Sequence, residues 1–120
     1  MTATATFRCV HLRGRSRRLG DVVVVELDGD ADLAAIPQLA QVLTRAINTT
    51  VTADTSGIVV DIDGLTVLDD AALGQLIGAA ASARRRELAF ALACTNEQVR
   101  RRLSETRVDQ IVDLVDHPPT

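Results

Sequence analysis

Two short apolar runs, each followed by a segment with helical spacing, most strongly constrain the fold of this 120-residue chain. Val22–Leu27 and Ile58–Ile62 have the nearly continuous β-branched composition of strands covered on both faces. Apolar residues recur every three or four positions from Leu33 to Ile47, and the same spacing resumes at Leu73. Strands that alternate with helices predict right-handed crossovers and a mostly parallel sheet.

The rest of the chain completes a β-β-α-β-α-β-α-β order, and 120 residues suffice for one core but not two. We therefore predict a single α/β domain over residues 1–120, a mostly parallel mixed sheet packed with helices. The further predicted elements are a strand Phe7–Leu12, a turn Arg13–Asp21, a polar connection Asn48–Gly57 without core residues, a helix Asp70–Arg86, a strand Leu88–Cys94, a helix opened by a capping box from Thr95 to Gln98, and a last strand Gln110–Val115.

Composition excludes several classes of function. No apolar stretch approaches the roughly 20 residues that cross a bilayer, and Met1–Leu19 lacks the apolar core of a secretory signal, so we expect a cytoplasmic protein without membrane contact. All 13 basic residues are Arg, so no lysine can act as a nucleophile. Ten acids against one Arg between Leu19 and Ala83, and no Trp or Tyr, argue against direct binding of nucleic acid.

The junction Asp69–Gly74 lies between the second apolar run and the next helix. Asp69 and Asp70 fall at the expected N-cap and first turn, where carboxylates accept from free backbone N–H groups. The loops 28–32, 63–70 and 94–96 all follow carboxyl ends of predicted parallel strands. Open α/β sheets place their sites at that edge. We therefore take it as the candidate site.

Two motifs at this edge resemble those of the STAS family, the sulfate transporter and anti-sigma factor antagonist domains. Gly29–Asp32 is similar to the family's Gly-Glu-(Leu/Ile)-Asp element, and Asp69–Gly74 to Asp-Ser-Ser-Gly-Leu-Gly. The resemblance extends from about Val22 to Val115 and implies a bacterial partner switch. In stand-alone members, the unphosphorylated domain binds a kinase-type anti-sigma factor, and phosphorylation of the second motif serine blocks that binding.

The motif departs from the family at the positions that matter for phosphorylation. Ala71 stands at the second serine, Asp70 at the first and Ala72 at the glycine, and Thr66 is the only hydroxyl from 57 to 81. Either Ala71 keeps the helix start uncharged and competent to bind, or Asp70 mimics phosphate, or the switch has decayed. We favour the first, because a carboxylate one residue earlier points about 100° away around the helix.

The resemblance predicts an anti-sigma factor antagonist-like regulator, not an enzyme, that binds its partner through the loop after the second strand and the start of the second helix. A STAS module that regulates a transporter or a stress-signalling complex is the alternative, and a weak homodimer is left open. The predicted partner-binding residues are Asp30, Asp32, Asp69, Asp70, Ala71 and Ala72.

A second alternative is a haloacid-dehalogenase-like phosphatase. Asp61 and Asp63 resemble that family's nucleophile and general acid. Thr66 is displaced by one position from the motif, and the chain has no lysine for the phosphate contact, so we do not adopt this interpretation. We predict no cofactor, and no metal site, since His11 and His117 lack a third ligand at metal spacing.

Two further features leave alternatives open. Cys9 and Cys94 are predicted as inert thiols, with a redox switch as the minor hypothesis, in which a helix N-terminus lowers the pKa of Cys94. Gly74 and Gly78 give the second helix a thin face. Close packing of that face on the sheet is favoured over contact with a partner helix.

Overall fold

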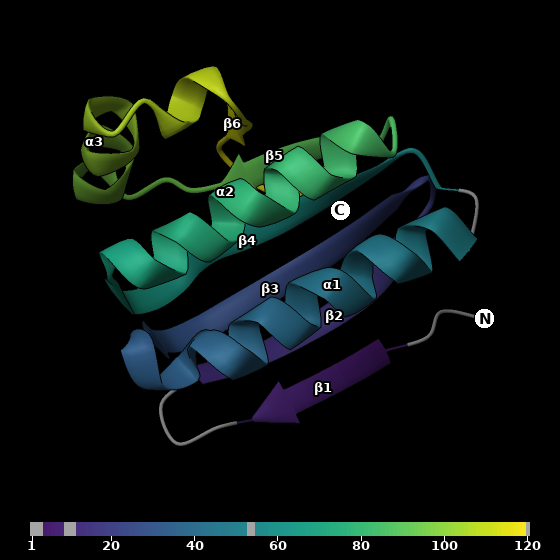
Figure 1. Cartoon of the computed structure of the whole chain (residues 1–120), viewed down its shortest axis with the longest axis horizontal. Coiled ribbons are helices and arrows are strands. Elements are labelled where there is room, and N and C mark those ends of the chain that lie inside the picture. The colour runs from purple at the N-terminus through teal and green to yellow at the C-terminus, as the bar shows by residue number, and fades with distance from the viewer. Residues whose placement is uncertain (1–3, 9–11, 53–54, 120) are drawn as a thin grey trace.

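The computed structural model describes residues 4–8, 12–52 and 55–119, and its strands form one six-stranded sheet in the order β1-β2-β3-β4-β5-β6 (Figure 1). The β3–β4, β4–β5 and β5–β6 pairs are parallel, whereas β1–β2 and β2–β3 are antiparallel. The predicted α/β class is confirmed. The elements are β1 Thr4–Arg8, β2 Leu12–Leu19, β3 Val22–Ala31, a 3-10 turn η1 Leu33–Ala35, α1 Ile36–Thr52, β4 Gly57–Leu68, α2 Asp70–Arg85, β5 Ala89–Ala93, α3 Glu97–Glu105, a 3-10 turn η2 Val108–Gln110, and β6 Asp113–Val115.

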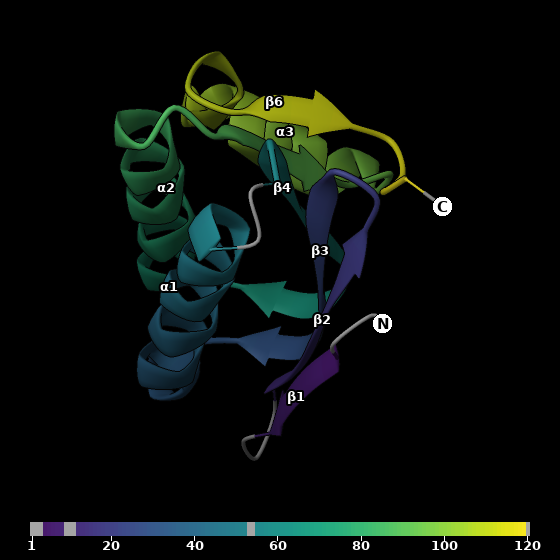
Figure 2. The same ribbon diagram turned by 90° about the vertical axis from the view of Figure 1, so that its right-hand side faces the viewer.

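The core lies between the sheet and the helices α1 and α2, which run side by side over one face of it (Figures 1 and 2). Alternate residues of β3 and β4 point into this layer, where they meet the apolar faces of the two helices. Among the residues described, no helix is both long and apolar enough to cross a membrane. The core includes Val23, Val25, Leu27, Ile58, Val60 and Ile62 of the strands and Leu39, Leu43, Leu73 and Leu76 of the helices.

The opposite face of the sheet buries Val24 but carries Glu26 and arginines of β2, so the prediction of strands covered on both faces was wrong in part. The predicted turn from Arg13 to Asp21 was wrong as well, because residues 12–19 form β2. Leu12 is buried and the next residue is exposed, the alternation of a half-buried antiparallel strand. On the open face, Arg15 and Arg17 each donate to Glu26 of β3 at 3.1 Å. Burial works to raise the pKa of Glu26, but these two guanidinium groups outweigh it and the pKa is lowered.

Two connections also differ from prediction. Helix α1 continues to Thr52, so the segment after Asn48 is not simply a polar loop. Thr50 is fully buried and donates its hydroxyl to the Ala46 carbonyl at 2.7 Å, and Thr55 is buried too. The prediction that this connection contributes no core residue was therefore wrong. The last strand is shorter than predicted, because η2 occupies the first part of that segment.

The ends of β3 and β4 were predicted as loops, but they stay paired. Glu26 is opposite Asp61 and Ala31 is opposite Leu68, so five steps along β3 match seven along β4, through two register shifts. Bulges of this kind bend a strand pair and increase its twist, and both strand ends turn toward the helix layer (Figure 2). We call residues 28–31 and 64–68 the β3–β4 tip. Pairing of β4 with β5 ends at Asp61, so only β3 pairs with β4 in the tip.

Candidate functional site

The start of α2 is held by Asp69, as predicted. Its backbone is extended, with φ −86° and ψ 175°, and its Oδ1 accepts from the backbone N–H of Ala72 at 3.0 Å. The backbone N–H of Asp69 donates to the carbonyl of Ala31 at 3.1 Å. The cap therefore fixes the first turn of α2 against the β3–β4 tip.

The neighbouring Asp70 forms an ion pair with α3. Its side chain is 94% exposed, yet Oδ1 accepts from Arg102 Nη2 on α3 at 2.7 Å. Such an exposed pair adds little stability, but it directs the carboxylate toward α3. Arg102 is 32 residues away in sequence, and only the fold brings it beside the start of α2.

The two alanines of the motif lie in different environments. Ala71 is exposed, whereas Ala72 is fully buried in the core. Only Ala71 therefore has its side chain on the surface, and Ala72 contributes to this helix start through the backbone N–H that Asp69 caps.

Asp30 and Asp32 lie at the end of β3 and are each engaged by a neighbour. Thr66 Oγ1 of β4 donates to Asp30 Oδ1 at 2.6 Å, and Asp32 caps η1 by accepting from the backbone N–H of Ala35 at 3.2 Å. Helical spacing assigned Leu33 to the core, but its side chain is 73% exposed, and Val67 of the tip is 42% exposed.

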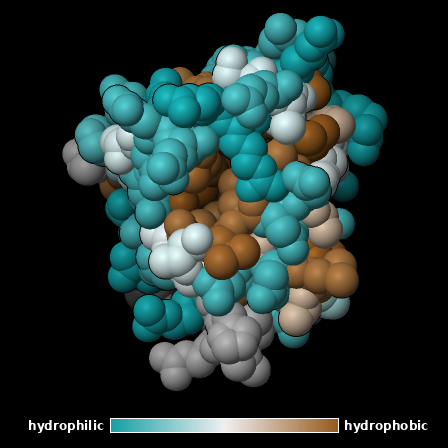
Figure 3. Space-filling model, turned by 90° about the vertical axis from the view of Figure 1, so that its left-hand side faces the viewer, coloured by the Kyte–Doolittle hydropathy of each residue, from teal (hydrophilic) through white to brown (hydrophobic). Residues whose placement is uncertain are grey.

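This end of the molecule is apolar at its centre and hydrophilic around it (Figure 3). We define the rim as the β3–β4 tip, η1 and the first turn of α2. The exposed Leu33 of η1 and Val67 of the tip belong to it, and Asp30, Asp32 and Asp69 lie in or next to the same segments. Large apolar side chains exposed at a polar margin are typical of interaction surfaces.

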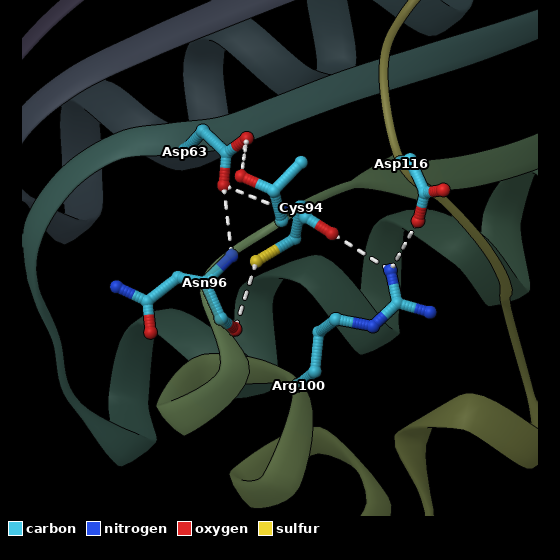
Figure 4. Close-up of polar contacts among 6 residues, drawn as sticks. Asp63, Cys94, Asn96, Arg100 and Asp116 are labelled. Carbon is cyan, nitrogen blue, oxygen red and sulfur yellow. Dashed lines mark hydrogen bonds and ion pairs between the residues drawn. The ribbon is translucent and has the colours of Figure 1, made fainter.

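Asp63 forms a brace beside the rim. It accepts from Thr95 through the backbone N–H at 2.7 Å and the hydroxyl at 2.9 Å, and from the backbone N–H of Asn96 at 3.4 Å (Figure 4). Burial works to raise the pKa of Asp63, but the hydrogen bonds outweigh it and lower the pKa. With Thr95 used in this way, α3 is capped by Asn96, and the predicted capping box was wrong.

Asp61 and Asp63, the pair that suggested a phosphatase, have backbone partners. Asp61 accepts from the backbone N–H of Asp63 at 3.0 Å. Burial and the negative charges of Asp63, Glu26 and Asp28 raise the pKa of Asp61. The described part of the chain holds no group of His, Cys, Asp or Glu side chains arranged to bind a metal ion.

Cys94 is buried at the end of β5, with its Sγ 3.8 Å from the carbonyl oxygen of Asn96 (Figure 4). Burial and the charge of Asp63 raise the pKa of the thiol. The expectation that the following helix lowers this pKa was therefore wrong. Cys9 and His11 lie outside the described residues, so the minor hypothesis of a redox switch at Cys9 and Cys94 stays untested.

The thin face of α2 is not packed on the sheet, so the favoured prediction for Gly74 and Gly78 was wrong. Both glycines are exposed, and a Cβ built on either would meet nothing within 4 Å. They line a groove of about 220 Å³ between α1 and α2, opposite Ala40, Thr44 and Asn48.

Comparisons with known proteins agree with this architecture. The family model described as the STAS domain matches residues 15–119. The crystal structure of the Thermotoga maritima protein TM1081 has a TM-score of 0.74 at 22% identity, covering 85% of each chain. The structure of an anti-sigma factor antagonist from Mycobacterium paratuberculosis has a TM-score of 0.65 at 21% identity, covering 96% of this chain and 87% of that one. The unphosphorylated Bacillus anti-sigma factor antagonist SpoIIAA has a TM-score of 0.61 at 17% identity, covering 97% of this chain and 90% of that one. No curated protein matches the chain.

Proposed function

Because this chain belongs to the STAS domain family, we propose that it is an anti-sigma factor antagonist-like regulator that binds a kinase-type anti-sigma factor through the rim. Structures of similar fold include anti-sigma factor antagonists, which supports the choice of partner. The protein acts in the cytoplasm as a binding module rather than as an enzyme, without direct contact to nucleic acid.

The observation that carries this proposal is the exposed apolar surface on an acidic rim. Ala71 is small and exposed two residues after the Asp69 cap, and Leu33 and Val67 present apolar side chains on other segments of the rim. The surrounding carboxylates favour a partner with an apolar recess and basic residues at its margin. Asp30 and Asp32 supply polar contacts, and Asp69 orients the helix start.

The rim lacks the serine at which family members are switched. Ala71 has no oxygen to accept phosphate, so the start of α2 stays uncharged at that position. Asp70 is a poor substitute for phosphate, because its carboxylate is bound by Arg102 of α3 and carries less charge. We therefore propose that the start of α2 is permanently competent to bind.

Substitution at Ala71 tests this proposal. The partner is first identified by pull-down from the native host, and binding is then measured by calorimetric titration. Ala71→Glu places a carboxylate in the path of close approach, and we expect binding to weaken by more than about 2 kcal/mol. The fold should tolerate the change, because a carboxylate in the first turn complements the helix dipole.

Arg85→Gln is the matched control, since Arg85 is exposed at the opposite end of α2. It should leave the affinity unchanged. Equal loss in both variants, or loss only at Arg85, would place the interface elsewhere. A transporter or a stress-signalling assembly as the captured partner would favour the alternative role of a STAS module in such a complex.

A further inference from the structure

We propose that Thr66 is a phosphorylation site on the rim, at which a kinase-type partner transfers the γ-phosphoryl group of ATP. The proposal rests on the proposed function, because it needs a kinase that docks at the rim. It moves regulation from the start of α2, where Ala71 has no hydroxyl, to the β3–β4 tip.

The position of Thr66 in the tip makes its hydroxyl accessible. Its side chain is exposed. Leu65 pairs with Gly29 and Val67 pairs with Asp30, so Thr66 is the extra residue of the bulge and has no partner on β3. Pairing with β5 has already ended at Asp61, so no strand in the described part of the chain pairs with the other edge of β4 here. The segment therefore offers an extended backbone to a docked enzyme.

The contact with Asp30 prepares the hydroxyl for transfer. Thr66 Oγ1 donates to Asp30 Oδ1 at 2.6 Å, a short bond of the kind that ionised acceptors form. In the transfer, Oγ1 forms a bond to the γ-phosphorus while the bond from that phosphorus to the β-phosphate oxygen breaks. ADP leaves, and the hydroxyl proton passes to Asp30. Protein kinases use an aspartate for the same proton.

Phosphate at Thr66 would change the charge of the rim. It adds about −1.5 to −2 charge where Asp30 already carries a carboxylate, and it removes the hydrogen that Asp30 accepts. It also lies beside Val67, part of the apolar centre. Both effects oppose a partner that binds an apolar surface with basic residues at its margin. We expect affinity to fall at least about tenfold.

Thr95, another hydroxyl at this end of the sheet, is less suited to the role. Its Oγ1 and its backbone N–H both donate to Asp63. Phosphorylation there would break the brace that ties β4 to the start of α3. Within the described residues, the side chain of Thr66 makes one hydrogen bond, an exposed contact to Asp30, and holds no backbone N–H, so the fold can tolerate its modification.

The experiment uses the identified partner with the full chain, Mg²⁺ and radiolabelled ATP, and maps the label by mass spectrometry. Wild type and Thr66→Ser should be labelled at position 66. Thr66→Val is assayed above its own measured dissociation constant and should stay unlabelled, whereas Thr44→Val, exposed on α1, should be labelled like wild type. Ala71→Ser restores the family's phosphorylation position and should gain a second label.

The outcomes separate this inference from the proposed function. If the partner binds wild type and labels Ala71→Ser but not Thr66, the inference is overturned and the function stands. Label on another hydroxyl of wild type, or none on a bound wild-type chain, also overturns it. If no partner binds at the rim, the proposed function fails and the inference fails with it.

Discussion

Two carboxylate–threonine pairs lie at the carboxyl edge of the sheet, and they differ in how they are tied to the fold. Asp63 accepts the hydroxyl of Thr95 and two backbone N–H groups from the β5–α3 connection. Among the residues that the structure describes, Asp30 accepts only the hydroxyl of Thr66. The first pair joins backbone segments, whereas the second joins two side chains. The same chemistry therefore stabilises the fold in one place and leaves a removable contact in the other.

Replacement of Asp63 is expected to have the largest effect on stability. Asp63→Ala removes three hydrogen bonds to one carboxylate, and because the group is exposed we expect a loss of about 2 kcal/mol in the free energy of unfolding. Denaturant unfolding measures it. Asp63→Asn, which keeps one acceptor oxygen, should lose less. If Asp63→Ala lowered the free energy of unfolding by less than Thr66→Val does, the Asp63–Thr95 pair would not stabilise the fold more than the Asp30–Thr66 pair.

The pH dependence gives an independent check on Asp63. Its pKa is lowered in the folded state, so its contribution is present above the unfolded value of about 3.9 and is lost as pH falls through the folded value. The difference in unfolding free energy between wild type and Asp63→Ala should therefore shrink below about pH 4. A difference that stays constant to pH 2 would mean that the charge of Asp63 contributes nothing.

Gly64 is the first residue of the tip on β4 and directly follows Asp63 of the brace, so it tests how tightly the two are joined. A Cβ at Gly64 would clash with Asp28 Oδ1 and lie 2.7 Å from the backbone carbonyl oxygen of Leu27. We expect Gly64→Ala to cost about 1.5 kcal/mol of unfolding free energy. Gly78→Ala is the control, where open space should give a gain of about 0.5 kcal/mol. A neutral Gly64→Ala would indicate that the tip yields easily.

The smallest effect is expected from the two threonines compared directly. Thr95→Val removes one bond of the brace and should cost about 1 kcal/mol. Thr66→Val keeps a β-branched side chain in the strand and removes one exposed bond, so it should cost less than about 0.5 kcal/mol. Thermal unfolding of both variants measures the difference. Equal losses would show that the tip contact is as structural as the brace.

Local sequence patterns correctly predicted those elements that are determined by residues close together in the sequence. The apolar runs of β3 and β4 and the Asp69 cap were identified from neighbours in sequence, and the structure confirms them. Strand β2 was missed because its arginines resemble a turn until their partner Glu26 is placed opposite them. Buried and exposed residues alternate along this strand, but the sequence shows many arginines because the charged side chains lie on the open face.

The candidate site was predictable in position but not in detail. The carboxyl edge follows from the parallel topology, and the motif residues were found there. Three facts depend on contacts between distant segments: Arg102 binds Asp70, Thr66 donates to Asp30, and Thr95 serves Asp63 instead of capping α3. The spacing of residues within one element cannot specify which of several possible partners a polar side chain binds.

The unequal lengths of the paired strands constrain how this rim can vary. Side chains alternate between the two faces along a strand. Deletion of one of the two extra residues of β4 would therefore move each side chain between that point and Asp69 to the opposite face of the sheet. Losing both would restore the phase but straighten the tip away from the helix layer. Insertions and deletions before α2 should therefore be tolerated, if at all, in steps of two. A family member whose β3 and β4 pair without extra residues would have to build its partner surface from other residues of the sheet edge.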